Sequence, residues 1–122
     1  MGPVPGLGNG QRGIAVGAYG LALETVDGRT WKSLAPRLPN PKQLHLYAVR
    51  RAGERIFMAG EQGLLLRSAD GGASFEALPS PYKGGLFGLL AAKTGTLLAF
   101  GLRGSLFRST DHGSSWQAVP SG

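Results

Sequence analysis

The sequence has no cysteine, few acidic residues and no long hydrophobic run. Without cysteine the chain has no disulfide framework, no thiolate metal site and no cysteine nucleophile. Only 7 of its 122 residues are Asp or Glu, which leaves few carboxylates for catalysis. No stretch approaches the roughly 20 apolar residues that cross a bilayer, so we expect no membrane insertion. The first residues also lack the basic start and apolar stretch of a signal peptide.

What the chain does contain is glycine and proline, with 21 and 8 residues respectively. Both residue types disfavour helix interiors and mark turns, so they favour many short strands. A hydrophobic content of 42% indicates a globular chain of one domain's size. The formal net charge is +6, which favours solubility or an acidic partner, although the basic residues are scattered along the sequence.

One segment recurs three times along the chain. Its copies begin at Gly17, Gly60 and Gly101, and they carry Asp27, Asp70 and Asp111. The copies are therefore 43 and then 41 residues apart. A period near 40 built from short apolar runs indicates the blades of a β-propeller.

Each full repeat contains four short apolar runs separated by glycine turns. In the second repeat the runs cover residues 46–49, 55–59, 64–68 and 75–78. Four antiparallel strands in a meander make one propeller blade. The runs are almost continuously apolar, so both faces of each sheet must be covered by neighbouring blades.

We therefore predict an all-β fold of about three four-stranded blades in an incomplete ring. The expected organisation is an irregular segment over residues 1–12 and a propeller over residues 13–122, with blades near 13–35, 46–78 and 86–119. The first repeat lacks a good inner strand because residues 2–10 are rich in Gly and Pro. Propellers close with about 4–8 blades, and three blades would expose two apolar faces. The chain is either a fragment of a longer propeller or associates with itself. We favour a homo-oligomer, in which a dimer makes a six-bladed ring.

The aspartate of each repeat lies in a short motif. The second and third copies read Ser68-x-Asp70-x-Gly72-x-x-Phe75 and Ser109-x-Asp111-x-Gly113-x-x-Trp116. The first copy, with Asp27 and Trp31, is one residue shorter. These motifs resemble the Asp-box, or bacterial neuraminidase repeat. Together with the glycine hairpin before each box, they resemble the photosystem II assembly and stability factor-like family, with sialidase-type propellers as more distant relatives. The resemblance implies a periplasmic or extracellular location.

We interpret the repeated aspartates as structural. A turn aspartate accepts hydrogen bonds from backbone N–H groups, and the following glycine permits a positive φ. The aromatic residue of the motif packs as an apolar anchor. The six structural residues are Asp27, Trp31, Asp70, Phe75, Asp111 and Trp116. We expect no metal and no cofactor at these turns.

A catalytic site is not evident from the remaining residues. Glycoside hydrolysis needs two carboxylates that face one sugar, and by repeat register the remaining glutamates do not converge. These are Glu24, Glu54, Glu61 and Glu76. Tyr47 beside Arg50 and Arg51 is the sole sialidase-like combination, and we interpret Tyr47 as a packed core residue. His45 and His112 are far apart in register and are expected on the surface. Catalysis stays open, and we favour its absence.

A binding surface is expected at the end of the blades opposite the aspartate turns, where the hairpins meet the long inter-blade loops. The candidate residues are Tyr19, Arg37, Lys42, His45, Glu61, Gln62, Tyr82, Lys83 and Arg103. Four cations against one carboxylate make this end basic and suited to an acidic protein or carbohydrate partner. Tyr19 and Tyr82 are its only candidates for stacking on bases, so nucleic-acid binding is not expected.

Two functions follow from these patterns. The first is a non-catalytic propeller scaffold that binds protein, of the assembly-factor type, and completes its ring by self-association. The alternative is part of a glycosidase, sialidase-like or carbohydrate-binding propeller, in which residues outside this chain supply the chemistry.

Overall fold

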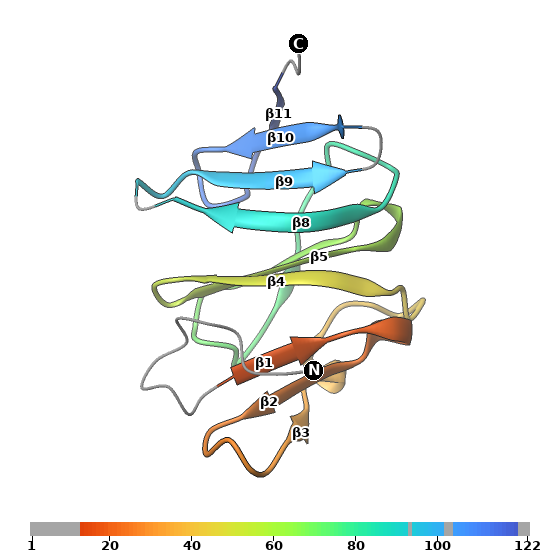
Figure 1. The fold of residues 1–122 in the computed structure, drawn as a ribbon, viewed down its shortest axis with the longest axis vertical. Helices are drawn as coiled ribbons and strands as arrows, with labels where there is room; N and C mark the ends of the chain where they lie inside the picture. Colours follow the sequence, from red (N-terminus) through yellow and green to blue (C-terminus); the bar gives the residue numbers. More distant parts are fainter. Residues whose placement is uncertain (1–12, 93, 102–103, 120–122) are drawn as a thin grey trace.

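The computed structural model describes residues 13–92, 94–101 and 104–119, and in these residues the chain forms three antiparallel sheets (Figure 1). The first sheet contains β1 (Gly13–Val16), β2 (Ala22–Thr25) and β3 (Lys32–Ser33). The second contains β4 (Leu46–Ala52), β5 (Arg55–Gly60), β6 (Leu65–Ser68) and β7 (Glu76–Ala77). The third contains β8 (Leu86–Ala91), β9 (Leu97–Gly101), β10 (Leu106–Ser109) and β11 (Gln117–Ala118).

Within each sheet the strands pair in the order of the sequence. Each sheet is therefore a meander, which is the topology of one propeller blade. The three sheets follow one another along the long axis of the molecule and do not close into a ring (Figure 1). The expected all-β architecture of about three blades in an incomplete ring is confirmed. The poor inner strand expected at residues 2–10 lies outside the described residues.

Tight glycine turns connect the second and third strand positions of the first two repeats. In the first sheet Tyr19 and Gly20 have φ values of 56° and 78°, and in the second Gln62 and Gly63 have 58° and 77°. Two consecutive residues with positive φ make a type I′ turn, whose twist matches that of the flanking strands. With the residue before each pair, they form the short 3-10 elements η1 (Ala18–Gly20) and η3 (Glu61–Gly63). A third such element, η2 (Ala35–Arg37), follows β3.

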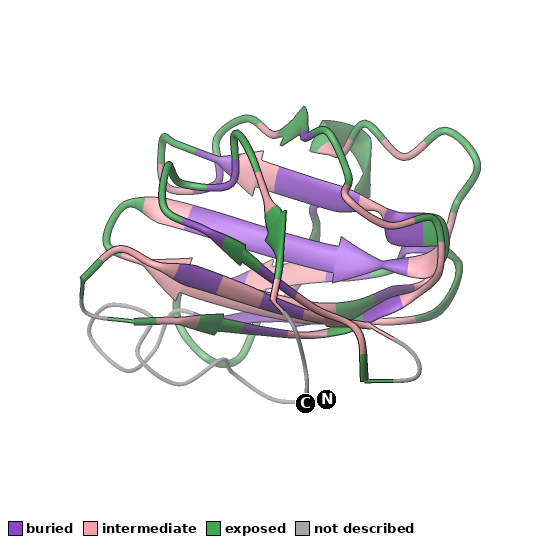
Figure 2. Ribbon diagram, turned by 90° about the horizontal axis from the view of Figure 1, so that it is seen from above, coloured by how far each residue is buried: buried purple, intermediate pink, exposed green. Residues whose placement is uncertain are grey.

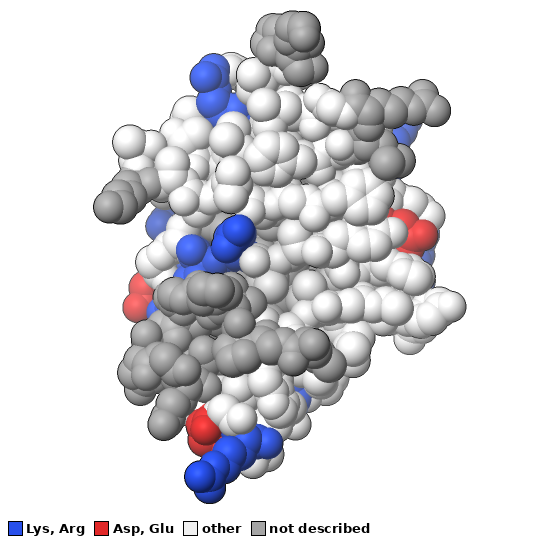
Figure 3. All heavy atoms as spheres, in the orientation of Figure 1, with Lys and Arg blue, Asp and Glu red and all other residues white. Residues whose placement is uncertain are grey.

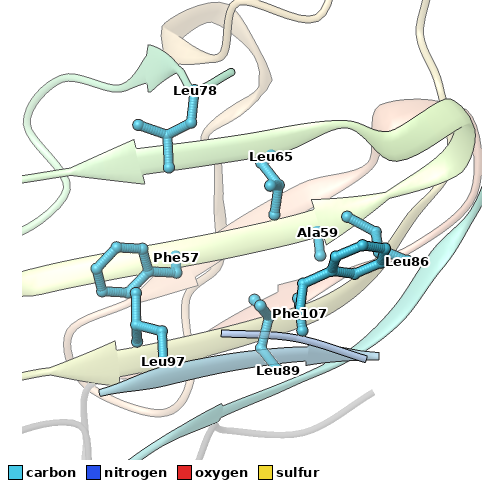
Figure 4. Close-up of a cluster of buried hydrophobic side chains, with 9 residues drawn as sticks. Phe57, Ala59, Leu65, Leu78, Leu86, Leu89, Leu97 and Phe107 are labelled. Atoms are coloured by element: carbon cyan, nitrogen blue, oxygen red, sulfur yellow. The ribbon is translucent and has the colours of Figure 1, made fainter. Parts of the chain in front are cut away.

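Two hydrophobic layers hold the sheets together, one on each face of the second sheet. Between the first and second sheets the buried side chains are Ile14, Ala22, Leu34, Leu46, Ile56, Met58 and Leu66. Between the second and third sheets they are Phe57, Ala59, Leu65, Leu78, Leu86, Leu89, Leu97, Ala99 and Phe107 (Figure 4). Buried residues concentrate in the strands and exposed residues in the turns (Figure 2). The second sheet is thus covered on both faces, as its continuous apolar runs require.

The innermost strands of the second and third sheets share an irregularity. The pairing of β4 with β5 shifts between Leu46 and Ala48, and that of β8 with β9 shifts between Leu86 and Gly88. A shift of this kind is a β-bulge, which bends a strand and re-aims a side chain. Both bulges lie at the start of the strand, beside the hairpin turns. Among the described residues, no helix has the length and apolarity to cross a membrane.

Candidate binding surface

The sheets have two distinct ends. At the aspartate-turn end, the turn that joins β4 to β5 meets the aspartate turn of the same sheet, where Gly71 N donates to Glu54 O at 3.0 Å. At the other end, here called the hairpin end, η3 contacts the loop before β4, where Glu61 N donates to His45 O at 2.9 Å. The division into two ends agrees with the strand parity of a meander. It fixes which side chains can act together.

The second and third aspartate turns have the same hydrogen-bond geometry. The Ser68 hydroxyl donates to Asp70 Oδ1 and accepts from Gly72 N, both at 2.8 Å. The Asp70 carboxylate also accepts from Ser74 N at 3.0 Å and from Ser74 Oγ at 2.6 Å. In the third sheet Ser109, Asp111 and Ser115 make the corresponding bonds. Each carboxylate therefore closes its own turn.

These hydrogen bonds stabilise the charged form of both aspartates. The Ser74 hydroxyl and backbone N–H, with the Ser68 hydroxyl, lower the pKa of Asp70 to about 2. Ser115 and Ser109 lower the pKa of Asp111 to about 2 in the same way. The lowered pKa makes these groups stable anions, which suits a turn and not a general acid.

The first aspartate turn is built differently because it is one residue shorter. Asp27 Oδ1 accepts from Arg29 N and Thr30 N at 2.8 Å each, and from the Thr25 hydroxyl at 3.1 Å. The backbone N–H groups of Thr30 and Arg29 lower the pKa of Asp27. In this turn no serine hydroxyl serves the second carboxylate oxygen, in contrast to Asp70 and Asp111.

The aromatic residues that follow the aspartates lie beside the turns. Trp116 Nε1 donates to Gly113 O at 3.0 Å, and its ring packs against the layer between the second and third sheets. Phe75 packs against the layer between the first and second sheets. Trp31 is half-buried. These contacts fix Phe75 and Trp116 beside the outer strands, so these two rings are not free to stack on a ligand.

Four aromatic side chains from three sheets form a continuous row at the hairpin end. The ring centroids of Tyr19 and His45 are 4.8 Å apart, those of His45 and Tyr47 are 6.3 Å apart, and those of Tyr47 and Phe87 are 4.6 Å apart. Tyr19, Tyr47 and Phe87 are 74%, 39% and 45% exposed. We call Tyr19, His45, Tyr47 and Phe87 the aromatic row. Exposed large aromatics in contact with one another are typical of a binding surface.

The two bulges explain why Tyr47 and Phe87 are exposed. Each residue lies at the bulge of its innermost strand, and β4 and β8 are neighbours in the stack. The bulge turns the ring away from the buried layer, so that the two rings stack at an interplanar angle of 27°. The interpretation of Tyr47 as a core residue was wrong. Phe87 was missed, although Leu46-Tyr47 and Leu86-Phe87 are equivalent pairs in the repeat.

Several other predicted site residues belong to the turns and loops of the hairpin end. Lys42 and Gln62 are at the hairpin end, and Lys83 is exposed in the loop before β8. His45 is half-buried between two tyrosines. Glu61 Oε1 accepts from His45 N at 2.9 Å, so this carboxylate holds the backbone of His45 against η3.

Tyr82 is at the hairpin end but is not a free surface ring. Its centroid lies 5.5 Å from that of Phe107, and the ring packs against the layer between the second and third sheets. A Cβ on Gly101 would lie 2.8 Å from Tyr82 Cε2, so the ring lies over this glycine. The loop that carries Tyr82 thus anchors the third sheet.

The Arg37 guanidinium lies at the aspartate-turn end, whereas the sequence predicted it at the hairpin end. Its Nη1 lies 2.8 Å from Glu24 Oε2 and donates to Gly72 O at 3.2 Å. Gly72 belongs to an aspartate turn, so Arg37 acts between the first two sheets. Arg103, the fourth predicted cation, lies outside the described residues. In the described residues the predicted cations of the hairpin end are therefore reduced to Lys42 and Lys83.

Charge is dispersed over the molecule. On the face that Figure 3 shows, Lys and Arg atoms lie in several separate places. Glu24 pairs with Arg37 at 2.8 Å, and Glu76 pairs with Arg67 at 3.1 Å. Within the described part of the chain, no group of three or more His, Asp or Glu side chains is placed to hold a metal ion. The aromatic row is thus the most distinct feature of the hairpin end.

The meander sheets, the stacked layers and the repeated aspartate turns define a set of β-propeller blades. Residues 7–121 match the family described as Photosynthesis system II assembly factor YCF48, and the chain belongs to this family. No match is found among the curated proteins.

Solved structures of two members of this family have the same fold. YCF48 bound to a D1 peptide is 27% identical with a TM-score of 0.78, covering 88% of this chain and 37% of that one. YCF48 from Cyanidioschyzon merolae is 28% identical with a TM-score of 0.72, covering 88% of this chain and 33% of that one. The chain therefore spans about a third of the length of these relatives.

An ancestral GH74 enzyme also matches, with 14% identity and a TM-score of 0.73 over 93% of this chain and 17% of that one. At this level of identity the likeness shows the fold alone. Propeller blades of this kind thus occur in an enzyme and in a peptide-binding assembly factor.

Proposed function

We propose that this chain is a non-catalytic propeller module that binds a peptide segment of a partner protein at the hairpin end. The aromatic row carries this proposal, because it crosses three sheets and leaves three large rings exposed. Exposed tyrosine and phenylalanine rings contribute most of the affinity in many protein interfaces. A relative with 27% identity binds a D1 peptide, which supports a peptide as the ligand.

The surroundings of the row suit a peptide that carries a carboxylate. Lys42 and Lys83 are exposed at the same end, and the nearby Glu61 is engaged by His45 N. The two lysines attract an acidic segment, and the rings supply apolar contact area. Charged groups at the rim of a site mainly change the association rate, so the rings should dominate the affinity.

The proposed binding can be measured by fluorescence anisotropy with a labelled D1 peptide and a scrambled peptide of the same composition. We expect saturable binding of the D1 peptide, and Phe87→Ser should weaken it about tenfold. Val26→Ser is the matched control, because Val26 is 65% exposed and lies at the aspartate-turn end. Absence of saturable binding, or equal weakening by both variants, would contradict the proposal.

The exposed rings also favour a second candidate, binding of a carbohydrate. Aromatic faces stack on sugar rings as they do on apolar peptide side chains. Binding of the chain to a glycan array, with loss of binding in Tyr47→Ser, would support this candidate over the first. Hydrolysis of a glycan by this chain alone would contradict a non-catalytic module.

We also propose that the arc of three sheets is completed by self-association. Among the sheets of the described residues, the third has a neighbour on one face, and propellers close with about 4–8 blades. Two copies of the chain would supply six sheets. A ring of this size would cover the outer face of the third sheet.

A further inference from the structure

A cleft of about 340 Å³ opens between the second and third sheets at the aspartate-turn end. The turn that joins β4 to β5 forms one wall, and the turn that joins β8 to β9 forms the other, both at the left of Figure 1. His112, from the aspartate turn of the third sheet, completes the lining. The volume falls within the range of about 300–1,000 Å³ that is typical of small-molecule sites.

The lining of this cleft divides into a cationic part and an apolar part. Arg51, Arg55 and His112 supply its polar side chains. The apolar part includes Phe57 and Leu97, which are each 2% exposed. Among the described residues that line the cleft, none is Asp or Glu. This division suits a ligand that carries one acidic group and one apolar group.

Both arginines come from the β4–β5 turn, and their charges are not neutralised there. Arg51 Nε donates to Gly53 O at 2.6 Å, which holds this side chain at the turn. Within residues 13–92, 94–101 and 104–119, the Nη groups of Arg51 and the Arg55 guanidinium have no hydrogen-bond or ion-pair partner. Their donors are therefore available to a ligand in the cleft.

The carboxylates nearest in sequence to these cations are directed elsewhere. Glu54 lies between the two arginines in the chain, but its Oε2 would be 3.8 Å from a Cβ on Gly71, in the aspartate turn of its own sheet. Asp111 precedes the histidine, and its carboxylate accepts from the Ser109 and Ser115 hydroxyls. An anion in the cleft would thus meet positive charge that no neighbouring acid has already engaged.

His112 occupies a backbone position that favours glycine. The residue after the turn aspartate is Gly28 in the first repeat and Gly71 in the second, with φ values of 77° and 72°. His112 has the same conformation, with a φ of 59°. A side chain at positive φ is strained, and strained residues concentrate at binding sites. A Cβ on Gly95 would lie 4.0 Å from His112 Cε1, so the imidazole extends toward the β8–β9 turn across the cleft.

We infer that this cleft binds a small phosphate ester, with its phosphate group on Arg51, Arg55 and His112 and its apolar group over Phe57 and Leu97. A phosphate ester has three terminal oxygens, one for each of the three side chains, whereas a carboxylate has two. Guanidinium groups form strong charged hydrogen bonds to phosphate oxygens. The cleft is at the opposite end of the sheets from the aromatic row, so this site is additional to the proposed peptide surface.

The test is a two-dimensional ¹H–¹⁵N NMR titration of the chain with phenyl phosphate. We expect saturable shifts of the backbone amides of Gly53, Gly95 and His112. Phenol lacks the anion and benzoate lacks one oxygen, so each should bind about tenfold more weakly or worse. Inorganic phosphate lacks the apolar group and should also bind about tenfold more weakly.

Three variants separate a ligand-binding role from a structural one. Arg55→Gln should raise the Kd for phenyl phosphate about tenfold, because it removes a charged hydrogen bond. His112→Gly restores the residue of the other two repeats, and it should raise the Kd about tenfold without lowering the thermal midpoint. Arg29→Gln is the matched control, because Arg29 is exposed in the first aspartate turn, and it should leave the Kd unchanged.

Absence of saturable shifts at the three amides would overturn the inference. Equal or tighter binding of phenol or benzoate would overturn it as well, because the phosphate group would then not be recognised. An unchanged Kd in His112→Gly, or a lowered thermal midpoint together with lost binding, would contradict the role given to His112. Equal weakening by Arg29→Gln and Arg55→Gln would show that the effect follows net charge and not this cleft.

Discussion

The second and third sheets have the same strand order and the same aspartate turn, but their surroundings differ. Leu65 in the second sheet is 2% exposed, whereas its counterpart Leu106 in the third sheet is half-buried. Phe57 and Leu98 show the same contrast. The comparison shows that equivalent positions of the repeat are buried where another described sheet follows and half-buried where none of the described sheets does. Stability in such a protein comes from the layers between repeats as much as from each repeat.

Leucine deletions at equivalent positions should give the largest difference between the two sheets. Leu65→Ala should lower the free energy of unfolding by about 2–5 kcal/mol, because it leaves a cavity in a closed layer. Leu106→Ala should cost about 1 kcal/mol in the single chain, because part of the side chain is already in water. Urea unfolding at low protein concentration measures both. Equal costs would mean that the third sheet is covered within one chain.

The aspartate turns should respond equally in the two sheets. Ser68 and Ser109 are 0% and 1% exposed, and each accepts the backbone N–H of a buried turn glycine at 2.8 Å. Replacing either by Ala leaves that N–H without its acceptor, so each variant should lose about 1–3 kcal/mol of unfolding free energy. Thermal and urea unfolding of both variants provide the check. Very different losses would show that the turn depends on the neighbouring sheet.

Substitution of equivalent arginines should also affect stability differently in the second and third sheets, but by a smaller amount than the leucine deletions. Arg67 is 16% exposed at its side chain and bridges two sheets, so Arg67→Ala should cost about 1–2 kcal/mol of unfolding free energy. Arg108→Ala should leave the unfolding of the single chain unchanged within about 0.5 kcal/mol. A loss of single-chain stability in Arg108→Ala would indicate an intramolecular partner for this residue.

The smallest effect is expected from acid. The folded-state pKa values of Asp70 and Asp111 are about 2, below the ordinary 3.8. A lowered pKa adds stability that is present above pH 3.8 and is lost as the pH falls from there through about 2. Asp70→Asn combined with Asp111→Asn should therefore flatten the dependence of stability on pH in this window. An unchanged acid profile in the double variant would show that other groups cause the dependence.

Much of the fold could be predicted from the sequence because each repeat encodes it locally. Consecutive positive-φ positions such as Gln62-Gly63 specify the hairpin, and the Ser68–Asp70 motif specifies the next turn. The period then places one repeat after another. These features depend on residues a few positions apart, which is the distance over which a sequence pattern is informative.

The candidate site was less predictable because it depends on contacts between repeats. The rings of Tyr47 and Phe87 meet only because two bulges re-aim them, and apolar runs such as residues 46–49 do not reveal a bulge. The loop position of Arg37 predicts the hairpin end, but its long side chain reaches the other end and pairs with Glu24. The loop position of Tyr82 is equally misleading, because its ring packs inward on Phe107. Loop membership predicts where a backbone lies and not where a long side chain ends.

Within the described residues the second sheet is buried on both faces and the third on one face, and amide hydrogen exchange at two protein concentrations tests this difference most directly. At the concentration where single chains dominate, amides of β5 and β6 should exchange slowest and those of β9 and β10 measurably faster. At the concentration where two chains associate, β9 and β10 should slow while β5 and β6 stay unchanged. Equal protection of the two strand pairs at both concentrations would contradict the account.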